Sequence, residues 1–145
     1  MITIRPATSA DLPPFLALLR HLNPRDPVPD PAKAQAAFDR MLASDQNIVF
    51  LAISGETLAA SCTLTIIPNL TRNARPYAVI ENVVTDPNFR RRGLGHAVLH
   101  AAQHAAWNAE CYKIMLATGR PELVPFYQAA GFALGGKSFF EMRRS

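Results

Sequence analysis

The stretch VVTDPNFRRRGLGH at residues 83–96 decides both the expected fold and the expected site. It begins inside the apolar run YAVIENVVTD at 77–86, which predicts a strand with apolar residues on both faces, as in the middle of a sheet. Residues 90–95 predict a tight turn, and a helix of about 14 residues is expected from there to near Asn108. The chain therefore passes from a central strand through an arginine and glycine turn into a helix.

This turn has the chemistry of an anion-binding site. The first amides of a helix lack acceptors within it, and the helix dipole places about half a positive charge there, so a pyrophosphate satisfies both. Gly93 and Gly95 let the backbone approach phosphates without an intervening Cβ, and the neighbouring arginines add charge. A basic helix entry without a ligand is the alternative, but the flanking strand and helix favour the anion site.

Two other phosphate loops do not fit the sequence. No GxxxxGK[ST] motif occurs, and Val98 stands where a Rossmann turn has its third glycine. Nucleotide hydrolysis and nicotinamide binding are therefore disfavoured.

The composition fits one domain over residues 1–145. With 49% apolar and 18% charged residues, the chain can bury a core without disulfides or a structural metal. No apolar run is long enough to span a membrane, and the first residues lack the apolar core of a signal peptide. Cys62 and Cys111 lie in apolar runs and are expected to be reduced packing residues, so we expect a cytoplasmic protein.

The net charge is concentrated in two short clusters. It is 15 − 11 = +4, and without the five arginines at 90–92 and 143–144 it would be 4 − 5 = −1. A local cluster suits a compact anion, such as a small phosphorylated ligand, better than a nucleic acid.

The whole chain predicts a mixed α/β fold in the order β-α-α-β-β-β-α-β-α-β. Thr8 with Asp11 predicts a capped helix start, and Pro13 and Pro14 fit its first turn.

The spacing in the helix that begins at Leu94 predicts one buried face. The expected buried residues are Leu94, Ala97, Val98, Ala101 and Ala105. Strands are expected at 2–7, 47–54, 57–67, 77–86, 111–118 and 132–143, helices at 12–22, 31–43, 94–108 and 121–130, and loops at 23–31 and 68–76.

The motif RRRGLG at 90–95 fits the pattern [RQ]xxGx[GA], with VVTDP before it and PFYQAAGF some thirty residues after it. In these features and in its order of elements, the chain resembles the GNAT N-acetyltransferase superfamily over essentially its whole length. The resemblance implies a mostly antiparallel central sheet flanked by helices. It also implies acetyl-CoA as cosubstrate, without a metal.

The resemblance assigns site residues by position. Tyr127 corresponds to the tyrosine that protonates the departing thiolate, although Phe126 and Tyr127 are also candidate core aromatics. Arg120 stands where many members carry an asparagine that contacts the coenzyme, which is a departure from the pattern. The implied pantetheine contacts are Val83, Val84 and Thr85, and the implied phosphate contacts are Arg91, Arg92, Gly93, Leu94, Gly95 and His96.

Glu81 is a second catalytic candidate. Strand alternation places it beside Val79 and Val83, where a solvated carboxylate is unexpected, and family members often have an acidic base on this strand. It would help to deprotonate an amine, directly or through water. With Glu81 as the base, Asn82 would offer hydrogen bonds to backbone or substrate. The alternative is that Glu81 is a structural carboxylate bonded to a loop amide or to an arginine such as Arg75.

The histidines at 96, 100 and 104 recur at helical spacing but lack further ligands, so a solvated stripe is favoured over a metal site.

Arg72, Arg75 and Tyr77 would favour an acceptor with a carboxylate or a phosphate. We therefore expect an acetyl-CoA-dependent N-acetyltransferase that acts on a primary amine of a small molecule or peptide by direct attack in a ternary complex. A non-catalytic acyl-CoA-binding sensor or interaction module is the alternative. Nucleic-acid and membrane partners are not expected, and relatives commonly form homodimers.

Overall fold

The computed structural model describes residues 1–144. The chain forms two compact units, Met1–Met115 and Leu116–Ser145, of which Ser145 lies outside the described residues. Within residues 1–144, no helix is both long and apolar enough to cross a membrane.

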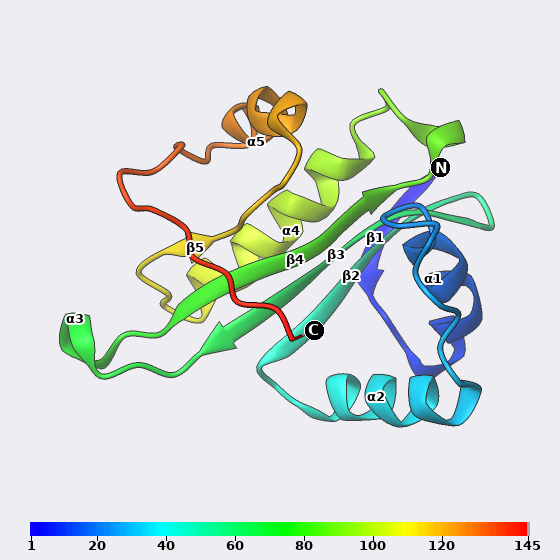
Figure 1. The fold of residues 1–145 in the computed structure, drawn as a ribbon, viewed down its shortest axis with the longest axis horizontal. Helices are drawn as coiled ribbons and strands as arrows, with labels where there is room; N and C mark the ends of the chain where they lie inside the picture. Colours follow the sequence, from blue (N-terminus) through cyan, green and yellow to red (C-terminus); the bar gives the residue numbers. More distant parts are fainter. Residues whose placement is uncertain (145) are drawn as a thin grey trace. The chain divides into compact units, whose positions relative to one another are not determined.

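The first unit is built on a five-stranded sheet in the order β1-β2-β3-β4-β5 (Figure 1). The first three pairings are antiparallel and the pairing of β4 with β5 is parallel, which confirms the expected mostly antiparallel sheet. The strands are β1 (Ile2–Pro6), β2 (Asn47–Ser54), β3 (Thr57–Ile67), β4 (Tyr77–Thr85) and β5 (Ile114–Met115).

Helices cover both faces of this sheet. On one face, Leu12 and Phe15 of α1 (Leu12–Leu19) and Phe38 of α2 (Pro31–Ala43) pack against Val49 and Leu51 of β2. Because side chains alternate along a strand, Phe50 and Cys62 lie on the other face, where the Cys62 thiol lies 3.3 Å from the Val98 carbonyl of α4 (Leu94–Asn108). The short elements of the unit are η1 (Ser9–Asp11), α3 (Thr71–Ala74) and η2 (Pro87–Phe89).

The predicted buried face of α4 was partly wrong. Leu94 and Val98 are buried as expected, but Ala97, Ala101 and Ala105 are only half-buried. Leu99 lies fully buried, because the helix is turned so that its larger side chains fill the space over the sheet. The buried face consists of Leu94, Gly95, Val98, Leu99, Ala102 and Ala106.

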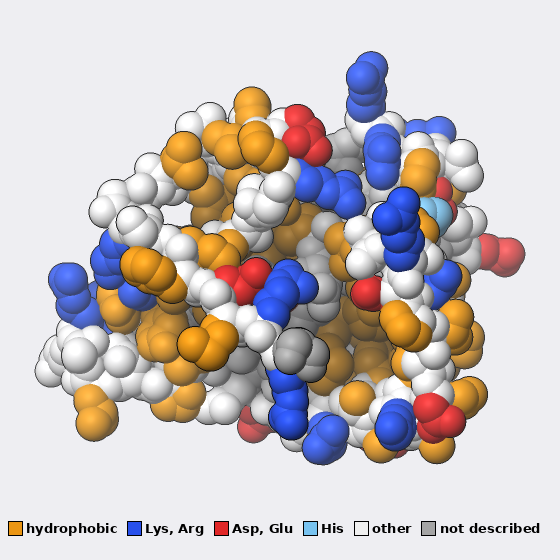
Figure 2. All heavy atoms as spheres, in the orientation of Figure 1, with side chains coloured by type: hydrophobic (Ala, Val, Ile, Leu, Met, Phe, Trp, Pro, Cys, Tyr) orange, Lys and Arg blue, Asp and Glu red, His pale blue; other side chains and the backbone are white. Residues whose placement is uncertain are grey.

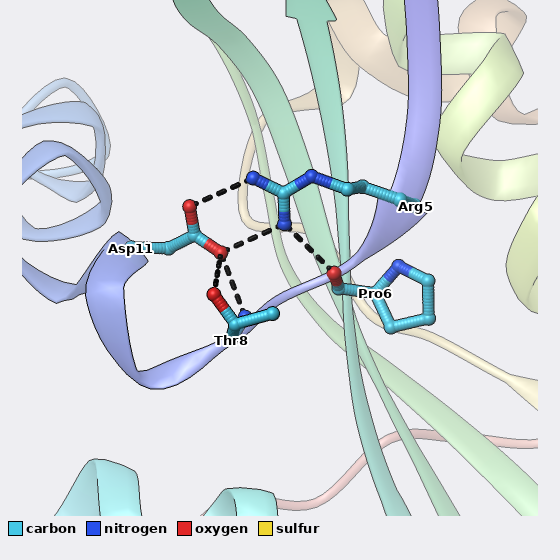
Figure 3. A network of polar contacts seen from close by, with 4 residues as sticks. All are labelled: Arg5, Pro6, Thr8 and Asp11. Carbon is cyan, nitrogen blue, oxygen red and sulfur yellow. Dashed lines mark hydrogen bonds and ion pairs between the residues drawn. The ribbon is translucent and has the colours of Figure 1, made fainter.

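An ion pair joins β1 to the start of α1 (Figure 3). Two guanidinium nitrogens of Arg5 donate to the two carboxylate oxygens of Asp11 at 2.8 and 2.9 Å, and Arg5 also donates to the Pro6 carbonyl. The Thr8 amide donates to the same carboxylate at 2.7 Å, so the expected capping box is present. These bonds lower the pKa of Asp11 to about 2, chiefly through the hydrogen bond from Arg5.

The second unit contains η3 (Pro121–Leu123) and α5 (Val124–Ala129). The α-helix begins three residues later than predicted, which places Pro125 in its first turn, where a proline is tolerated. Gly131 has a φ of +100° and follows the helix end, as expected.

Two predicted strands were wrong in extent. β5 covers only Ile114–Met115, because its pairing with β4 ends at Val79 opposite Met115. Residues 132–143 contain no strand, because Gly135 and Gly136 interrupt the segment and the residues that follow bury nothing. Phe139 and Phe140 are 71% and 88% exposed, so neither side of this segment is buried as one face of a strand would be.

Candidate active site

A β-bulge interrupts the middle of β4. Thr63 of β3 lies opposite Glu81 and Ser61 lies opposite Val84, so Asn82 and Val83 together face a single β3 residue. Asn82 has a φ of +54°, a left-handed conformation that asparagine adopts more readily than most residues. The bulge bends β4 and changes where the following backbone groups point.

Glu81 is exposed, so the prediction of a carboxylate buried in the sheet was wrong. It shares the sheet face with Thr63, where the core cluster of α1 and α2 packs around Val49 and Leu51 of β2, two strands away. α1 also contacts β3 and β4, but the Glu81 side chain stays exposed. Arg75 does not pair with it, because the Arg75 Nε donates to the backbone carbonyl of Glu110 at 3.2 Å. Glu81 is therefore open to an incoming molecule.

Two buried hydroxyls beside Glu81 were missed in the sequence. The side-chain oxygens of Ser61 and Thr63 are buried and have no hydrogen-bond partner among the described residues. The third hydroxyl in this alternating series, Thr65, donates to Asn47 at 2.9 Å. The spacing of hydroxyl residues at 61, 63 and 65, all on one face of a strand, was a signal that could have found them.

The second half of β4 has one unpaired edge in the described structure. Its pairing with β5 ends at Val79, whereas its pairing with β3 continues to Thr85. Backbone N–H and C=O groups along such an edge are available to a ligand. Val83 and Thr85 are half-buried there, and Val84 is buried at 6% exposure.

The turn after β4 is held by its own hydrogen bonds. The Asp86 amide donates to the Ala59 carbonyl at 2.8 Å, which continues the pairing to β3. The Asp86 carboxylate accepts from the Asn88 amide at 2.8 Å, and the guanidinium carbon of Arg92 lies 5.0 Å from the centre of the Phe89 ring. The arginines at 90–92 are all exposed, and Figure 2 shows Lys and Arg side chains gathered at this end of the first unit.

The turn delivers its backbone to the start of α4 in a conformation that suits glycine. Gly93 has a φ of +77°, and a Cβ built on it would meet no protein atom within 4 Å. The first helical bond runs from the Ala97 amide to the Gly93 carbonyl at 3.0 Å, so the amides of Leu94 and Gly95 precede the hydrogen-bonded turns. The rings of His96 and His100 stack with centroids 6.3 Å apart.

Tyr127 belongs to the second unit, where it is 9% exposed. Its ring makes edge-to-face contacts with Phe126 at 5.0 Å and Phe132 at 6.3 Å between centroids. The Tyr127 carbonyl accepts from the Phe132 amide at 3.1 Å. The Tyr127 ring is therefore held by one aromatic residue within α5 and by another that follows the helix.

The two cysteines are packing residues, as expected. Burial raises the pKa of the Cys62 thiol to about 12 and also raises that of Cys111, where the nearby charge of Arg75 acts in the opposite direction. A thiol with such a pKa holds very little thiolate at neutral pH, so Cys62 is unsuited to covalent catalysis. Within residues 1–144, no three His, Cys, Asp or Glu side chains lie together as a metal site.

The comparisons with known proteins agree with this arrangement. The acetyltransferase (GNAT) family model matches residues 15–132. Glucosamine 6-phosphate N-acetyltransferase from Trypanosoma brucei brucei is 33% identical over 131 residues, which cover 90% of this chain and 88% of that protein. Glucosamine 6-phosphate N-acetyltransferase 1 from Oryza sativa subsp. japonica is 33% identical over 133 residues, with 89% and 79% covered.

A solved structure from Agrobacterium tumefaciens strain C58, described as a candidate acetyltransferase, superimposes with a TM-score of 0.93 at 44% identity. The match covers 98% of this chain and 99% of that one. The fold, the glycine turn at the start of α4 and the family match agree over most of the chain. This protein belongs to the GNAT family of acetyltransferases, and it is an N-acetyltransferase that depends on acetyl-CoA.

Proposed function

We propose that the acceptor is a small amine of the amino-sugar phosphate class, acetylated by direct attack within a ternary complex. The observation that supports the binding of acetyl-CoA is the unpaired edge of β4. This edge contains the bulge at Asn82 and is followed along the chain by the glycine turn at Gly93. The acceptor half is supported by two relatives at 33% identity, both glucosamine 6-phosphate N-acetyltransferases.

The coenzyme would lie along β4 and end at the start of α4. Backbone groups of the open strand edge suit the amides of the pantetheine arm, which would continue the sheet as an added strand does. The helix start, whose first amides precede the intrahelical hydrogen bonds, suits the pyrophosphate together with the exposed arginines. The residues concerned are Val83, Val84 and Thr85 for the arm, and Arg91, Arg92, Gly93, Leu94, Gly95 and His96 for the phosphates.

Acetyl-CoA supplies the activated acetyl group, and the residues of the chain supply proton transfer and orientation. Glu81 accepts a proton from the acceptor ammonium, directly or through water, which frees the nitrogen lone pair for attack on the thioester carbon. The backbone amide of Val83 donates to the thioester oxygen as charge builds on it. The C–N bond forms, the C–S bond breaks, and Tyr127 gives its phenolic proton to the departing thiolate. The attacking nitrogen releases its second proton to water as the amide forms, and a proton from water returns Tyr127 to its neutral form.

A coenzyme-dependent thiol-release assay tests this function. Purified protein with acetyl-CoA should release free thiol when glucosamine 6-phosphate is added and should yield N-acetylglucosamine 6-phosphate by mass spectrometry. A protein that binds acetyl-CoA in calorimetry but releases no thiol with any amine of a broad panel would be a sensor instead. Release with aminoglycosides or peptides alone would keep the transferase and replace the acceptor class.

A further inference from the structure

Two tyrosines and two cations converge at the end of the sheet where β4 begins. The guanidinium carbon of Arg72 lies 5.5 Å from the centre of the Tyr112 ring, and the Lys113 Nζ lies 5.3 Å from the same centre. Lys113 also lies 5.3 Å from the Tyr77 ring centre, and the two tyrosine rings meet edge to face at 6.4 Å. We call these four residues the tyrosine–cation cluster.

Among the described residues, no carboxylate forms an ion pair with this cluster. The ion pairs among residues 1–144 involve Arg5, His21 and Arg143, and neither Arg72 nor Lys113 takes part in one. Both positive charges lie within 5.5 Å of the Tyr112 ring centre, and their attraction to the ring offsets only a small part of the repulsion between them. An anion that contacts both side chains would offset that repulsion.

The backbone that carries Arg72 is held in an uncommon conformation. Arg72, Asn73 and Ala74 have φ values of +54°, +60° and +59°, and none of the three is glycine. Left-handed residues of this kind cost roughly 1–2 kcal/mol each, least for asparagine. The turn is closed by Asn69, whose side-chain nitrogen lies 2.7 Å from the Thr71 hydroxyl and donates to the Arg75 carbonyl at 3.1 Å.

The pKa of the Tyr112 hydroxyl is shifted by the same two positive charges. Partial desolvation raises the pKa of Tyr112, but hydrogen bonds to Lys113 and Thr71 and the charges of Lys113 and Arg72 outweigh it, so the net pKa lies below its usual value. The hydroxyl is thus polarised toward its ionised form. An anion placed at the cluster would reverse this effect and raise the pKa of Tyr112.

The cluster lies on the same strand as the candidate base. Tyr77 and Glu81 are four residues apart on β4, so their side chains share a face and their Cα atoms are about 13 Å apart. We propose that Arg72, Lys113 and the Tyr112 hydroxyl bind the phosphate monoester of the acceptor, while its amine faces Glu81. The dianionic phosphate matches the two unpaired cations. This inference rests on the proposed acceptor class.

The test compares Arg72→Gln and Lys113→Gln with Arg40→Gln, an exposed arginine on α2, in assays with glucosamine 6-phosphate and glucosamine side by side. Each cluster variant should raise KM for the phosphorylated acceptor about tenfold or more, as expected for one lost charge-assisted hydrogen bond. The KM values for glucosamine and acetyl-CoA should stay unchanged. Equal losses on both acceptors, or no loss relative to Arg40→Gln, would overturn the proposal.

A binding measurement separates failure of the site from failure of the acceptor class. Glucose 6-phosphate, which has no amine, should bind in calorimetry and raise the tyrosine pKa seen by ultraviolet titration, and Tyr112→Phe should abolish that shift. If glucosamine 6-phosphate is not acetylated but glucose 6-phosphate still binds in an Arg72-dependent manner, the phosphate site stands and the acceptor class fails. If glucose 6-phosphate does not bind, the phosphate site is wrong.

Discussion

Thr63 and Glu81 lie opposite one another on β3 and β4, immediately before Asn82 bulges out of the ladder. Thr63 is 7% exposed and its hydroxyl has no hydrogen-bond partner within residues 1–144, whereas Glu81 is exposed. A buried hydroxyl without a partner costs free energy in the folded state, so this position is not optimised for stability. On this face of the sheet, the pair therefore marks the boundary between the buried part at β3 and the exposed part at β4.

Glu81→Gln should lower kcat about 100-fold at neutral pH, because the amine loses the group that accepts its proton. The loss should shrink as the pH rises toward the pKa of the free amine, which then deprotonates in solution. A pH–rate profile from pH 6 to 10 measures this. Glu56→Gln, an exposed carboxylate in the turn before β3, is the matched control. A profile of Glu81→Gln that parallels the unmodified protein would remove the base role.

Thr63→Val should raise the free energy of unfolding by about 1 kcal/mol, because it removes an unpartnered buried hydroxyl at nearly constant volume. Thr65→Val should lower it by about 1 kcal/mol, because that hydroxyl bonds to Asn47. Urea denaturation of the two variants gives the comparison. Destabilisation of both to the same degree would mean that Thr63 has a partner in solution.

Gly93→Ala should weaken acetyl-CoA binding at least tenfold and destabilise the fold by about 1 kcal/mol, since alanine at a φ of +77° strains the turn. Calorimetry and thermal unfolding measure the two effects. Gly136→Ala is the control, because a Cβ there also meets no atom within 4 Å and its φ lies outside the left-handed range. Undiminished affinity in Gly93→Ala would place the coenzyme elsewhere.

Tyr127→Phe should reduce turnover strongly and leave acetyl-CoA binding intact, because the ring packing against Phe126 and Phe132 does not need the hydroxyl. Stopped-flow thiol release and calorimetry on the same preparation separate the two quantities. Wild-type turnover across the pH range would assign Tyr127 to packing alone.

Elements specified by local signals could be predicted almost to the residue. α2 begins where the Asp30 side chain accepts from the Lys33 amide before Pro31, and β2 covers the predicted 47–54. The prediction of a carboxyl-terminal strand was wrong. An alternating pattern indicates which side chains would share a face of a strand, but it does not show whether a neighbouring strand is there to pair with it. Local pattern is therefore sufficient for caps and hairpins and insufficient for sheet edges.

The candidate site was predictable in part for a similar reason. The positive φ of Gly93 suits the residue type, so a glycine-dependent turn before α4 could be predicted from the sequence, while its role in coenzyme binding stays a prediction. The exposure of Glu81 depends on where α1 and α2 pack, and the meeting of Arg72 with Tyr112 joins segments forty residues apart. Such long-range relationships leave no periodic signal in the sequence.

The Arg5–Asp11 pair should make stability depend on pH in the acid range. Its carboxylate has a folded pKa of about 2 against 3.8 in the unfolded chain, so the unfolded state binds the proton first as the pH falls. The stabilisation is therefore complete above about pH 4 and is lost between about pH 4 and pH 2. After allowance for solvent screening it amounts to roughly 1–2 kcal/mol. Asp11→Asn should lose this part of the pH dependence, which urea denaturation at pH 2.5 and pH 6 measures, with the exposed Asp39→Asn of α2 as control. An equal slope in both variants would show that the ion pair does not form in solution.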